Sequence, residues 1–343
     1  MKKKKLIPII MLICITVFII WRIVDSRYPT IKLKEEPKEI YTYSYDERLT
    51  VLYDDSIVIY DEYGKSTEYI VDSDVVIADM YPVGDFAWVI DENKNLHKMT
   101  YMSEGKVQFS DIILVDIVDL AAEDDSFCAV TSDGELYVWG NNEYSSLGLK
   151  DIEYVDEPTK IDYISMVSQV VFVNSGTYVL KHDGTVFYSG WACGYNQNGE
   201  AYETYIEEYT LIEELHGIKE IYGGYMFYAI DSDGNITCSS GYTYDDKNKK
   251  YNVEFAEEIS HECQSKNICK FSGGVKYSIG LSEEGLIYLW GVNYAKAPVD
   301  KSGHEYLYAP EKIPRIGKVD NAYGALSTIY AKKGLTIYII GGK

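Results

Sequence analysis

Short hydrophobic runs alternate with polar turns along most of the chain, and the pattern returns at a fixed interval. Around Gly134 the chain reads CAVTSDGELYVWG, and around Gly184 it reads YVLKHDGTVFYSG. Runs rich in Val, Ile, Tyr and Phe on both sides of an Asp-Gly turn are typical of a β-hairpin. Glycine adopts a positive φ there at no steric cost, and aspartate accepts hydrogen bonds from the turn backbone. A further apolar run precedes each copy, as at Ile117–Leu120 and Val170–Val173, so several short antiparallel strands per copy are predicted.

The turns recur about every fifty residues. The predicted structural turn residues are Asp133, Gly134, Asp183, Gly184, Asp233, Gly234, Gly285 and Gly334. A second glycine closes each copy, at positions 140, 190, 241, 291 and 341. Two glycine registers with one period indicate an internal repeat, which is typical of solenoids, propellers and arrays.

Two earlier copies are less regular. Trp88–Met99 has Lys94 where the turn glycine is expected, and Val51–Tyr60 has a tighter turn. A sheet of a few strands cannot bury both of its faces alone, whereas sheets stacked around an axis do so. We therefore predict an all-β fold, a seven-bladed β-propeller over residues 39–343. Glu39–Asp46 is expected to supply the missing strand of the last copy, which removes exposed edges. No amphipathic helix is evident after residue 27.

The best-preserved copy resembles the repeat of the regulator of chromosome condensation family. In AVTSDGELYVWGNNEYSSLG the matching residues are Trp139, Gly140, Asn142, Tyr144, Leu147 and Gly148, while Ser145-Ser146 replaces a Gly-Gln pair. The copy that continues Trp290-Gly291-Val292-Asn293 is the next most similar. The resemblance covers roughly residues 39–343 and implies seven blades, each a four-stranded antiparallel sheet. It does not imply the nucleotide exchange on a small GTPase that some members perform inside the cell, because a fold does not fix function.

The first 27 residues differ from the rest. Lys2–Lys5 precede the apolar run Leu6–Val24, and a run of about 17–25 apolar residues spans a bilayer as a helix. We predict a cytoplasmic basic tail at 1–5, a single transmembrane signal anchor at 6–24 and a linker at 25–38. The lysines favour a cytoplasmic N-terminus, which places the propeller outside the cytoplasm, at the cell membrane of a bacterial-type cell. A signal peptide cleaved near Val24–Ser26, and thus a secreted binding protein, is the alternative.

Charge restricts the class of partner. The net charge is −22, and residues 1–27 carry +5, which leaves −27 on the remainder. Such a polyanion is repelled by phosphate backbones, so nucleic acid is not expected as a partner. We interpret the negative charge as that of a solvated surface on a monomer. A cationic partner and loosely bound calcium stay open.

Signatures of catalysis and of cofactor or metal binding are absent from the sequence. Asp231–Asn235 resembles part of a calcium loop, but its glycine is misplaced and Ser240 stands where the glutamate ligand belongs. The five histidines form no H-E-x-x-H motif, and no CxxC occurs. The carboxylate pairs Glu207-Glu208, Glu213-Glu214 and Glu257-Glu258 leave an extracytoplasmic carbohydrate-active enzyme as an alternative. A disulfide between Cys263 and Cys269 also stays open. We expect a protein without cofactor or metal that is not an enzyme.

Aromatic residues in the loops that follow the hairpins are the candidate interaction surface. Tyrosine and tryptophan are enriched at recognition surfaces because they bring a large area with little loss of rotamer freedom. The candidates are Tyr144, Trp191, Tyr195, Tyr202, Tyr242, Tyr244, Tyr294 and Tyr306. We predict a membrane-anchored, non-enzymatic binding or scaffold module that presents propeller loops to a protein or a cell-wall glycan.

Overall fold

The computed structural model describes residues 28–43, 45–195, 200–245, 250–293, 297 and 305–341. The predicted span Leu6–Val24 and the basic tail lie outside these ranges. Within the described ranges, no helix has both the length and the apolar character needed to cross a bilayer.

Consecutive strands pair antiparallel in groups of four. The first two groups are β2 (Glu39–Thr42), β3 (Leu49–Leu52), β4 (Ser56–Tyr60) and β5 (Ser66–Ile70), then β6 (Ile77–Val83), β7 (Phe86–Asp91), β8 (Leu96–Met102) and β9 (Lys106–Phe109). The next two are β10 (Ile117–Glu123), β11 (Ser126–Thr131), β12 (Leu136–Asn141) and β13 (Tyr154–Lys160), then β14 (Val167–Phe172), β15 (Gly176–Lys181), β16 (Val186–Tyr195) and β17 (Ala201–Leu211).

The remaining groups follow the same order, with one helix inserted. They are β18 (Ile218–Tyr222), β19 (Phe227–Asp231), β20 (Ile236–Asp245) and β21 (Lys250–Phe255), then, after α2 (Glu257–Ser265), β22 (Ile268–Gly274), β23 (Tyr277–Ser282), β24 (Ile287–Val292) and β25 (Tyr306–Lys312). The last group combines β26 (Asn321–Gly324), β27 (Ile329–Lys333) and β28 (Thr336–Ile340) with β1 (Thr30–Lys32) from the other end of the described chain.

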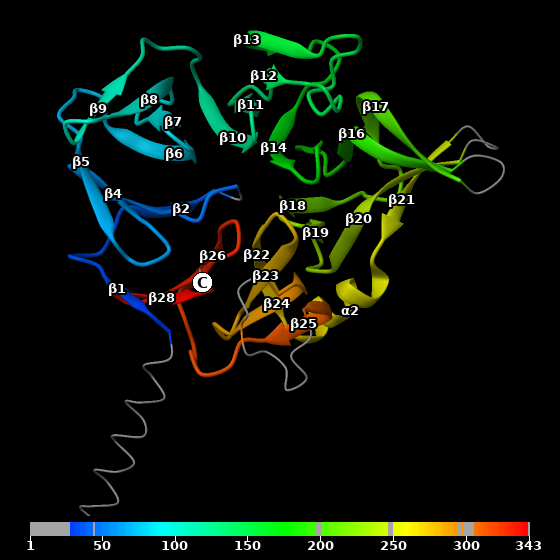
Figure 1. Ribbon diagram of the computed structural model, residues 1–343. Helices are drawn as coiled ribbons and strands as arrows, with labels where there is room; N and C mark the ends of the chain where they lie inside the picture. The colour runs from blue at the N-terminus through cyan, green and yellow to red at the C-terminus, as the bar shows by residue number, and fades with distance from the viewer. Residues whose placement is uncertain are drawn as a thin grey trace, which may run out of the picture.

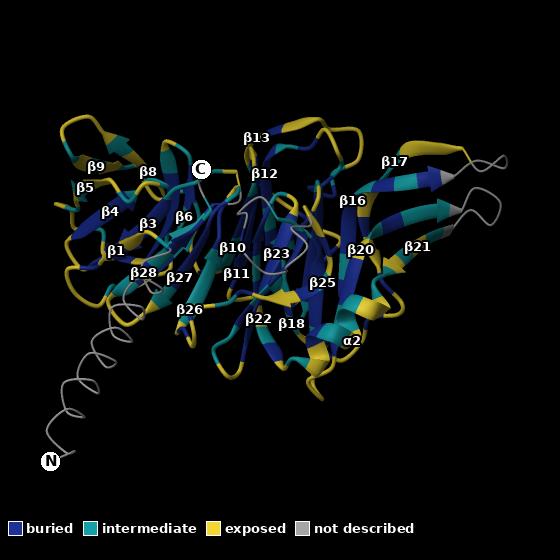
Figure 2. Ribbon diagram, turned by 60° about the horizontal axis from the view of Figure 1, so that its bottom comes forward, coloured by how far each residue is buried: buried dark blue, intermediate teal, exposed yellow. Residues whose placement is uncertain are grey.

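The groups stand around a common centre. The first strand of each group, β2, β6, β10, β14, β18, β22 or β26, contacts the first strand of the next, and β26 contacts β2, so the circuit is closed (Figure 1). The second strands are mostly buried, and β11 and β23 are buried along their whole length, whereas the fourth strands are mostly exposed, as in β5 and β13. The core therefore lies between neighbouring groups, as Figure 2 shows by the dark-blue strands inside the ring.

Aromatic side chains fill the space between groups. Trp88 of β7 meets Trp139 of β12 edge to face with ring centroids 5.0 Å apart, and Phe127 stacks on Trp139 at 5.6 Å. A group of four short strands has two apolar faces, and stacking it against neighbours on both sides buries both. The tryptophan at the end of the repeat strand thus packs between neighbouring sheets.

The predicted turns have the backbone that the pattern requires. Gly134, Gly184, Gly234 and Gly285 have φ between +76° and +82°. Lys94, at the glycine position of an irregular copy, also has a positive φ of 64°, a conformation that costs a residue with a Cβ free energy. The carboxylate that holds the turn varies between copies. Asp183 accepts from the backbone N–H of Thr185, but in the next copy Asp231 takes this role and Asp233 is a donor to it.

Two expectations about secondary structure were wrong. The strand that closes the ring is Thr30–Lys32, which pairs with β28, whereas Glu39–Thr42 pairs with β3 and starts a group of its own. The pairing with β28 needs only three residues, too short a run to stand out by pattern. The second error concerns helices, since α2 follows β21. The described cysteines, including Cys263 and Cys269, are free thiols.

Candidate binding site

Two neighbouring hairpins are longer than their counterparts. β16 and β17 have 10 and 11 residues and β20 has 10, whereas β12 and β24, at the same place in the repeat, have 6 each. Figure 1 shows both hairpins reaching away from the ring on the same side. We call the projecting part the hairpin arm, defined as residues 191–195, 201–205, 242–245 and 250–253.

The hairpin arm is a single small sheet built from two groups. Cys193, Gly194 and Tyr195 of β16 pair in parallel with Thr243, Tyr244 and Asp245 of β20, which gives the strand order β17-β16-β20-β21. The hydroxyl of Tyr251 donates to the backbone oxygen of Tyr205 at 3.0 Å. An isolated hairpin is marginal in water, and a sheet of more strands is stabilised. The parallel pairing therefore lets both hairpins extend beyond the ring.

Aromatic side chains gather on the arm and beside it. The ring of Tyr202, 38% exposed, lies over Gly194, where a Cβ would stand 2.4 Å from it. Trp191 is half-buried opposite Tyr205 in the hairpin register. Tyr144, 43% exposed, comes from the loop after β12 with its ring centroid 6.4 Å from that of Tyr205. Three predicted interaction residues from two separate loops are thus brought together.

The other predicted aromatics have different surroundings. Tyr244 belongs to the arm, and its ring packs 4.8 Å from Tyr251. Tyr242 is only 5% exposed and stacks on Tyr188 at 4.0 Å, so it serves the core. Tyr306 lies on β25, next to Tyr308, which is 81% exposed and was not singled out by its position in the sequence. Tyr195 ends β16 with its side chain outside the description, and Tyr294 lies outside the described residues.

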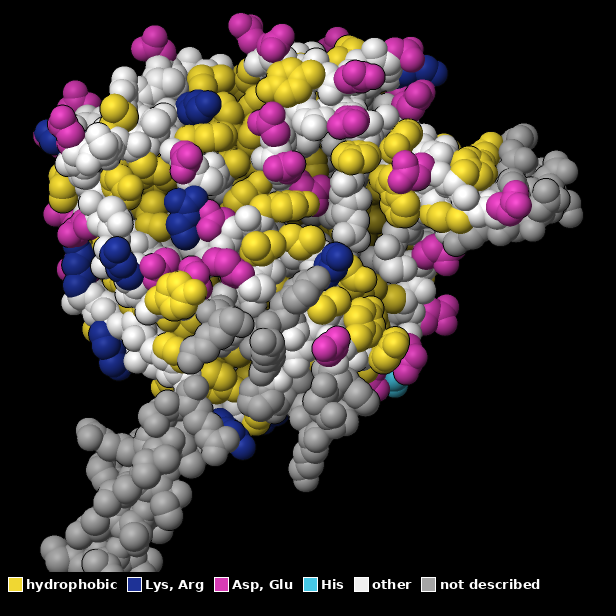
Figure 3. Space-filling model, viewed as in Figure 1, with side chains coloured by type: hydrophobic (Ala, Val, Ile, Leu, Met, Phe, Trp, Pro, Cys, Tyr) yellow, Lys and Arg dark blue, Asp and Glu magenta, His cyan; other side chains and the backbone are white. Residues whose placement is uncertain are grey.

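A cavity of about 230 Å³ opens at the base of the hairpin arm. Its walls are mainly apolar, and exposed carboxylates stand at its rim; the lining includes Ile206, Leu211, Ile212, Tyr251, Val253, Glu213 and Glu214. Figure 3 shows that acidic side chains outnumber basic ones over the face seen there and that hydrophobic side chains lie along the arm. Apolar walls with a negative rim suit an apolar or aliphatic segment that carries positive charge.

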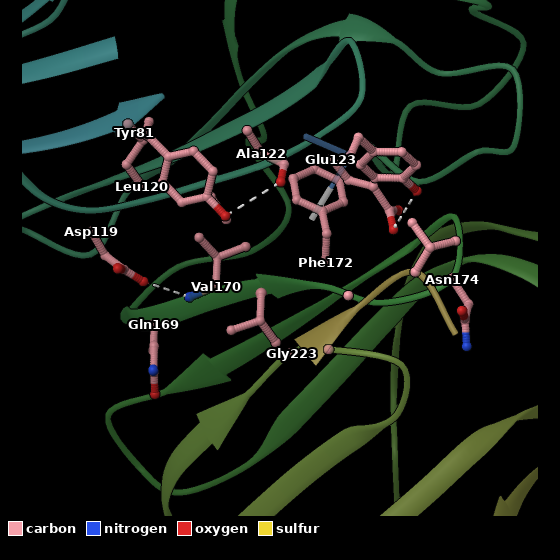
Figure 4. A pocket seen from close by; sticks show the side chains of 16 residues that line it. Tyr81, Asp119, Leu120, Ala122, Glu123, Gln169, Val170, Phe172, Asn174 and Gly223 are labelled. Atoms are coloured by element: carbon pink, nitrogen blue, oxygen red, sulfur yellow. Dashed lines mark hydrogen bonds between the residues drawn. The ribbon is translucent and has the colours of Figure 1, made fainter. Parts of the chain in front are cut away.

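A second cavity, of about 260 Å³, lies where β6, β10 and β14 converge near the centre (Figure 4). Asp119 accepts from the backbone N–H of Val170 at 2.7 Å, and Glu123 accepts from that of Ser175 at 2.9 Å. Burial raises the pKa of both carboxyls to about 7. Perturbed carboxyls of this kind are common at functional sites.

The contacts of these two carboxyls give them a structural role. Asp119 follows a β-bulge in β10, and Gln169 follows the equivalent bulge in β14. Gln169 also reaches the next first strand, because its amide donates to the oxygen of Ile221 at 2.8 Å and accepts from its N–H at 2.9 Å. Asp119 and Gln169 thus each clasp the first strand of the next group. A β-bulge changes the direction of a side chain, and here it turns Asp119 and Gln169 toward the next sheet.

The predicted carboxylate pairs are spread over the described structure. Glu207 and Glu208 lie on β17, Glu213 and Glu214 follow it, and Glu257 and Glu258 form the first turn of α2. Asp119 and Glu123 were missed because their burial depends on the closed ring. The signal present in the sequence was their place in the apolar run before a hairpin, where a carboxylate is out of pattern.

Comparison with known proteins agrees with this geometry. Models of the regulator of chromosome condensation (RCC1) repeat match residues 133–180 and 117–145. Residues 117–180 therefore match the RCC1 repeat. The chain is similar to the regulator of chromosome condensation of Xenopus laevis, with 23% identity over 257 residues, and to an RCC1-like G exchanging factor-like protein of Homo sapiens, with 28% over 123 residues. These matches cover 67% and 35% of this chain, but only 59% and 26% of the relatives' own lengths.

The fold is that of an RCC1-like propeller. The structure of Prp20p from Saccharomyces cerevisiae superimposes with a TM-score of 0.62 over 87% of this chain and 82% of that one, at 12% identity. That protein is described with its binding properties to Gsp1p and histones. At this identity the likeness establishes the architecture, and the four-stranded groups described above are its blades.

Proposed function

We propose that the chain is a non-enzymatic binding module that uses the hairpin arm to hold a protein partner. The observation that carries the proposal is the parallel pairing of β16 with β20. This pairing makes a rigid platform from two blades and displays Trp191, Tyr202 and Tyr244 on it. A preorganised surface loses less freedom on binding than separate loops do. Prp20p, of the same fold, is described as binding other proteins.

We propose seven blades and a membrane anchor for this module. The described strands form seven four-stranded groups, the last completed by β1, which supports the count suggested by the repeats. The apolar run Leu6–Val24 behind four lysines supports a single-pass anchor with the propeller outside the cytoplasm. Protease added to intact cells tests this topology. The blades should be digested without lysis, and protection until lysis would contradict the proposal.

Crosslinking with the full-length chain in membranes tests the binding function. Bound proteins are compared between the natural chain, the arm variant Trp191→Ser/Tyr202→Ser/Tyr244→Ser, and a control, Tyr306→Ser/Tyr308→Ser, which removes exposed aromatics from another blade. We expect a protein recovered with the natural chain and the control to fall at least about tenfold with the arm variant, as for loss of interface anchors. Equal recovery with all three would reject the arm as the site.

Two other outcomes would replace the proposal. Binding to a glycan array that depends on the same three residues, with no protein crosslinked, would make the partner a carbohydrate. Turnover of a polysaccharide that is lost in Asp119→Asn or Glu123→Gln would make the chain an enzyme, because those substitutions keep a hydrogen-bond acceptor and remove only the ionisable group.

A further inference from the structure

Two buried cysteines face each other where the only helix in the described part of the chain packs on the propeller. Cys238 belongs to β20 and Cys263 to α2, and both are 0% exposed. The Cys238 side chain is the first cause of the raised pKa of the Cys263 thiol, so the two thiols are close neighbours. Both belong to the core cluster that also contains Tyr228 and Trp290. No other described cysteine shares that cluster.

Three backbone hydrogen bonds fix the helix against the strand at this point. The N–H of Cys238 donates to the Ser260 hydroxyl at 2.9 Å, and the N–H of Ile236 donates to the Gln264 side-chain oxygen at 2.9 Å. The N–H of Ala256 donates to the backbone oxygen of Cys238, also at 2.9 Å. Residues three and four apart share one helix face, so the bonds from 260 and 264 orient the face that carries Cys263.

The repeat does not account for this arrangement. Cys238 stands four residues after its turn glycine, where other copies have Val138, Tyr188 and Leu289. Those residues fill the core without a thiol, and α2 is an insertion between β21 and β22. The copy that carries cysteine at this position is the one in which the inserted helix adds a second cysteine beside it.

We propose that Cys238 and Cys263 are a modification site, at which a disulfide forms and fastens α2 to β20. The electron acceptor is a disulfide donor, either oxidised glutathione or a thiol–disulfide oxidoreductase. One cysteine thiolate attacks the donor disulfide, which gives a mixed disulfide and releases one donor thiol. The second thiolate attacks the mixed disulfide at the protein sulfur, which forms the Cys238–Cys263 bond and releases the second donor thiol. The donor is reduced by two electrons, and the two protein thiol protons end on the released thiols.

Burial determines when the bond forms. The neighbouring Cys238 thiol and then burial raise the pKa of the Cys263 thiol far above its usual range, and the thiolate is the species that attacks. The docked pair is therefore slow to react. The bond forms during folding, or when α2 is undocked, and the docked helix then shields it from reductants.

Refolding of the full-length protein in a glutathione redox buffer, followed by peptide mapping without reduction, tests the site. We expect a peptide linking Cys238 to Cys263, loss of two free thiols, and a rise in Tm of about 5 °C that dithiothreitol reverses, because the bond closes a chain segment of about 25 residues. Cys238→Ala and Cys263→Ala should each abolish the rise. Cys269→Ala, which removes the competing partner for Cys263, should leave it unchanged.

Each result decides the proposal. A link between Cys263 and Cys269, free thiols at 238 and 263 after oxidative refolding, or a linked protein with a lower Tm would overturn it. The natural chain is also treated with oxidised glutathione without unfolding. There, faster oxidation of the docked pair than of the half-buried Cys269 would contradict the shielding that the structure shows.

Discussion

The blade β10–β13 and the two blades that carry the hairpin arm begin alike and diverge two residues after their closing glycine. In the first, Asn142 is buried, donates to the backbone oxygens of Leu149 and Ile152 at 2.7 and 2.6 Å, and accepts from the N–H of Leu147 at 2.8 Å. Asn293 holds the same place in β22–β25 and bonds to Ala297 in both directions.

The arm blades lack this asparagine. Ala192 and Thr243 stand in its place, and the strand continues outward. An asparagine that satisfies loop backbone folds the chain back over the ring, because its amide takes over the hydrogen bonds of the turn. Where it is missing, the backbone pairs with the neighbouring hairpin instead. A change at one repeat position thus accompanies the change from a closed loop to a projecting surface.

The largest expected loss of stability comes from a core tryptophan, and a tryptophan on the hairpin arm provides the comparison. Trp290 is 1% exposed, and its indole N–H donates to the Tyr228 hydroxyl at 3.0 Å. Trp290→Ala should lower the free energy of unfolding by about 3–5 kcal/mol. Trp191→Ala, on the arm, should cost about 1 kcal/mol or less while reducing partner binding. Urea denaturation measures both losses. Equal losses would contradict the assignment of Trp290 to the core and of Trp191 to the binding surface.

The next largest expected loss of stability comes from replacing Asn142. Asn142→Ala removes three hydrogen bonds and leaves two backbone oxygens and one N–H without their partner, so we expect a loss of about 2–4 kcal/mol. The matched change on the arm, Thr243→Ala, removes one side-chain bond, to Glu254, and should cost less than about 1 kcal/mol. Hydrogen exchange across 143–153 should rise in the first variant. Unchanged protection there would show that the loop does not depend on Asn142.

The repeat pattern predicts the parts of the fold that recur. The turns, the all-β class and the order of strands follow from glycines fifty residues apart. The pattern does not predict features that occur only once in the described chain. β1 is a three-residue strand, and α2 begins without a side-chain cap, so the acids Glu257 and Glu258 in its first turn were its main signal. Tyr242 and Tyr244, two residues apart, are buried and half-buried respectively, a difference set by the neighbouring blade and not by local sequence.

The side chains that join neighbouring first strands differ in charge, so their contributions to stability should differ in pH dependence. Asp119 and the neutral Gln169 hold equivalent positions. Because its pKa of about 7 lies above the usual value, Asp119 binds its proton more tightly in the folded protein, and its contribution to stability falls as pH rises from about 4 to 7. Asp119→Asn should therefore stabilise the protein more at pH 8 than at pH 5, by on the order of 2 kcal/mol.

Gln169→Glu makes the opposite change. It introduces a half-buried carboxylate and removes the donor to Ile221, so the free energy of unfolding should fall, and fall further at pH 8 than at pH 5. Thermal denaturation at both pH values measures the pair. Parallel pH profiles for the natural chain and Asp119→Asn would show that the Asp119 carboxyl titrates outside this range.

The smallest expected effect concerns a regular and an irregular turn. Lys94 holds a positive φ that glycine holds in the regular copies. Lys94→Gly should raise the free energy of unfolding by about 0.5–1 kcal/mol, because glycine takes this conformation without steric cost. Lys94→Ala keeps the Cβ and should bring no gain. A gain from both variants would point to the lysine charge instead of the backbone.

The seam between β1 and β28 has a consequence for biosynthesis. Lys32 reaches Thr336 across 304 residues of chain, so the first described strand to be made pairs with the last. At about 5–20 residues per second, a ribosome needs about 15–60 s to supply that partner. Throughout this interval β1 lacks its pairing strand, and the nascent blades can only stack in an open arc. A chain terminated before residue 336 never completes the circle.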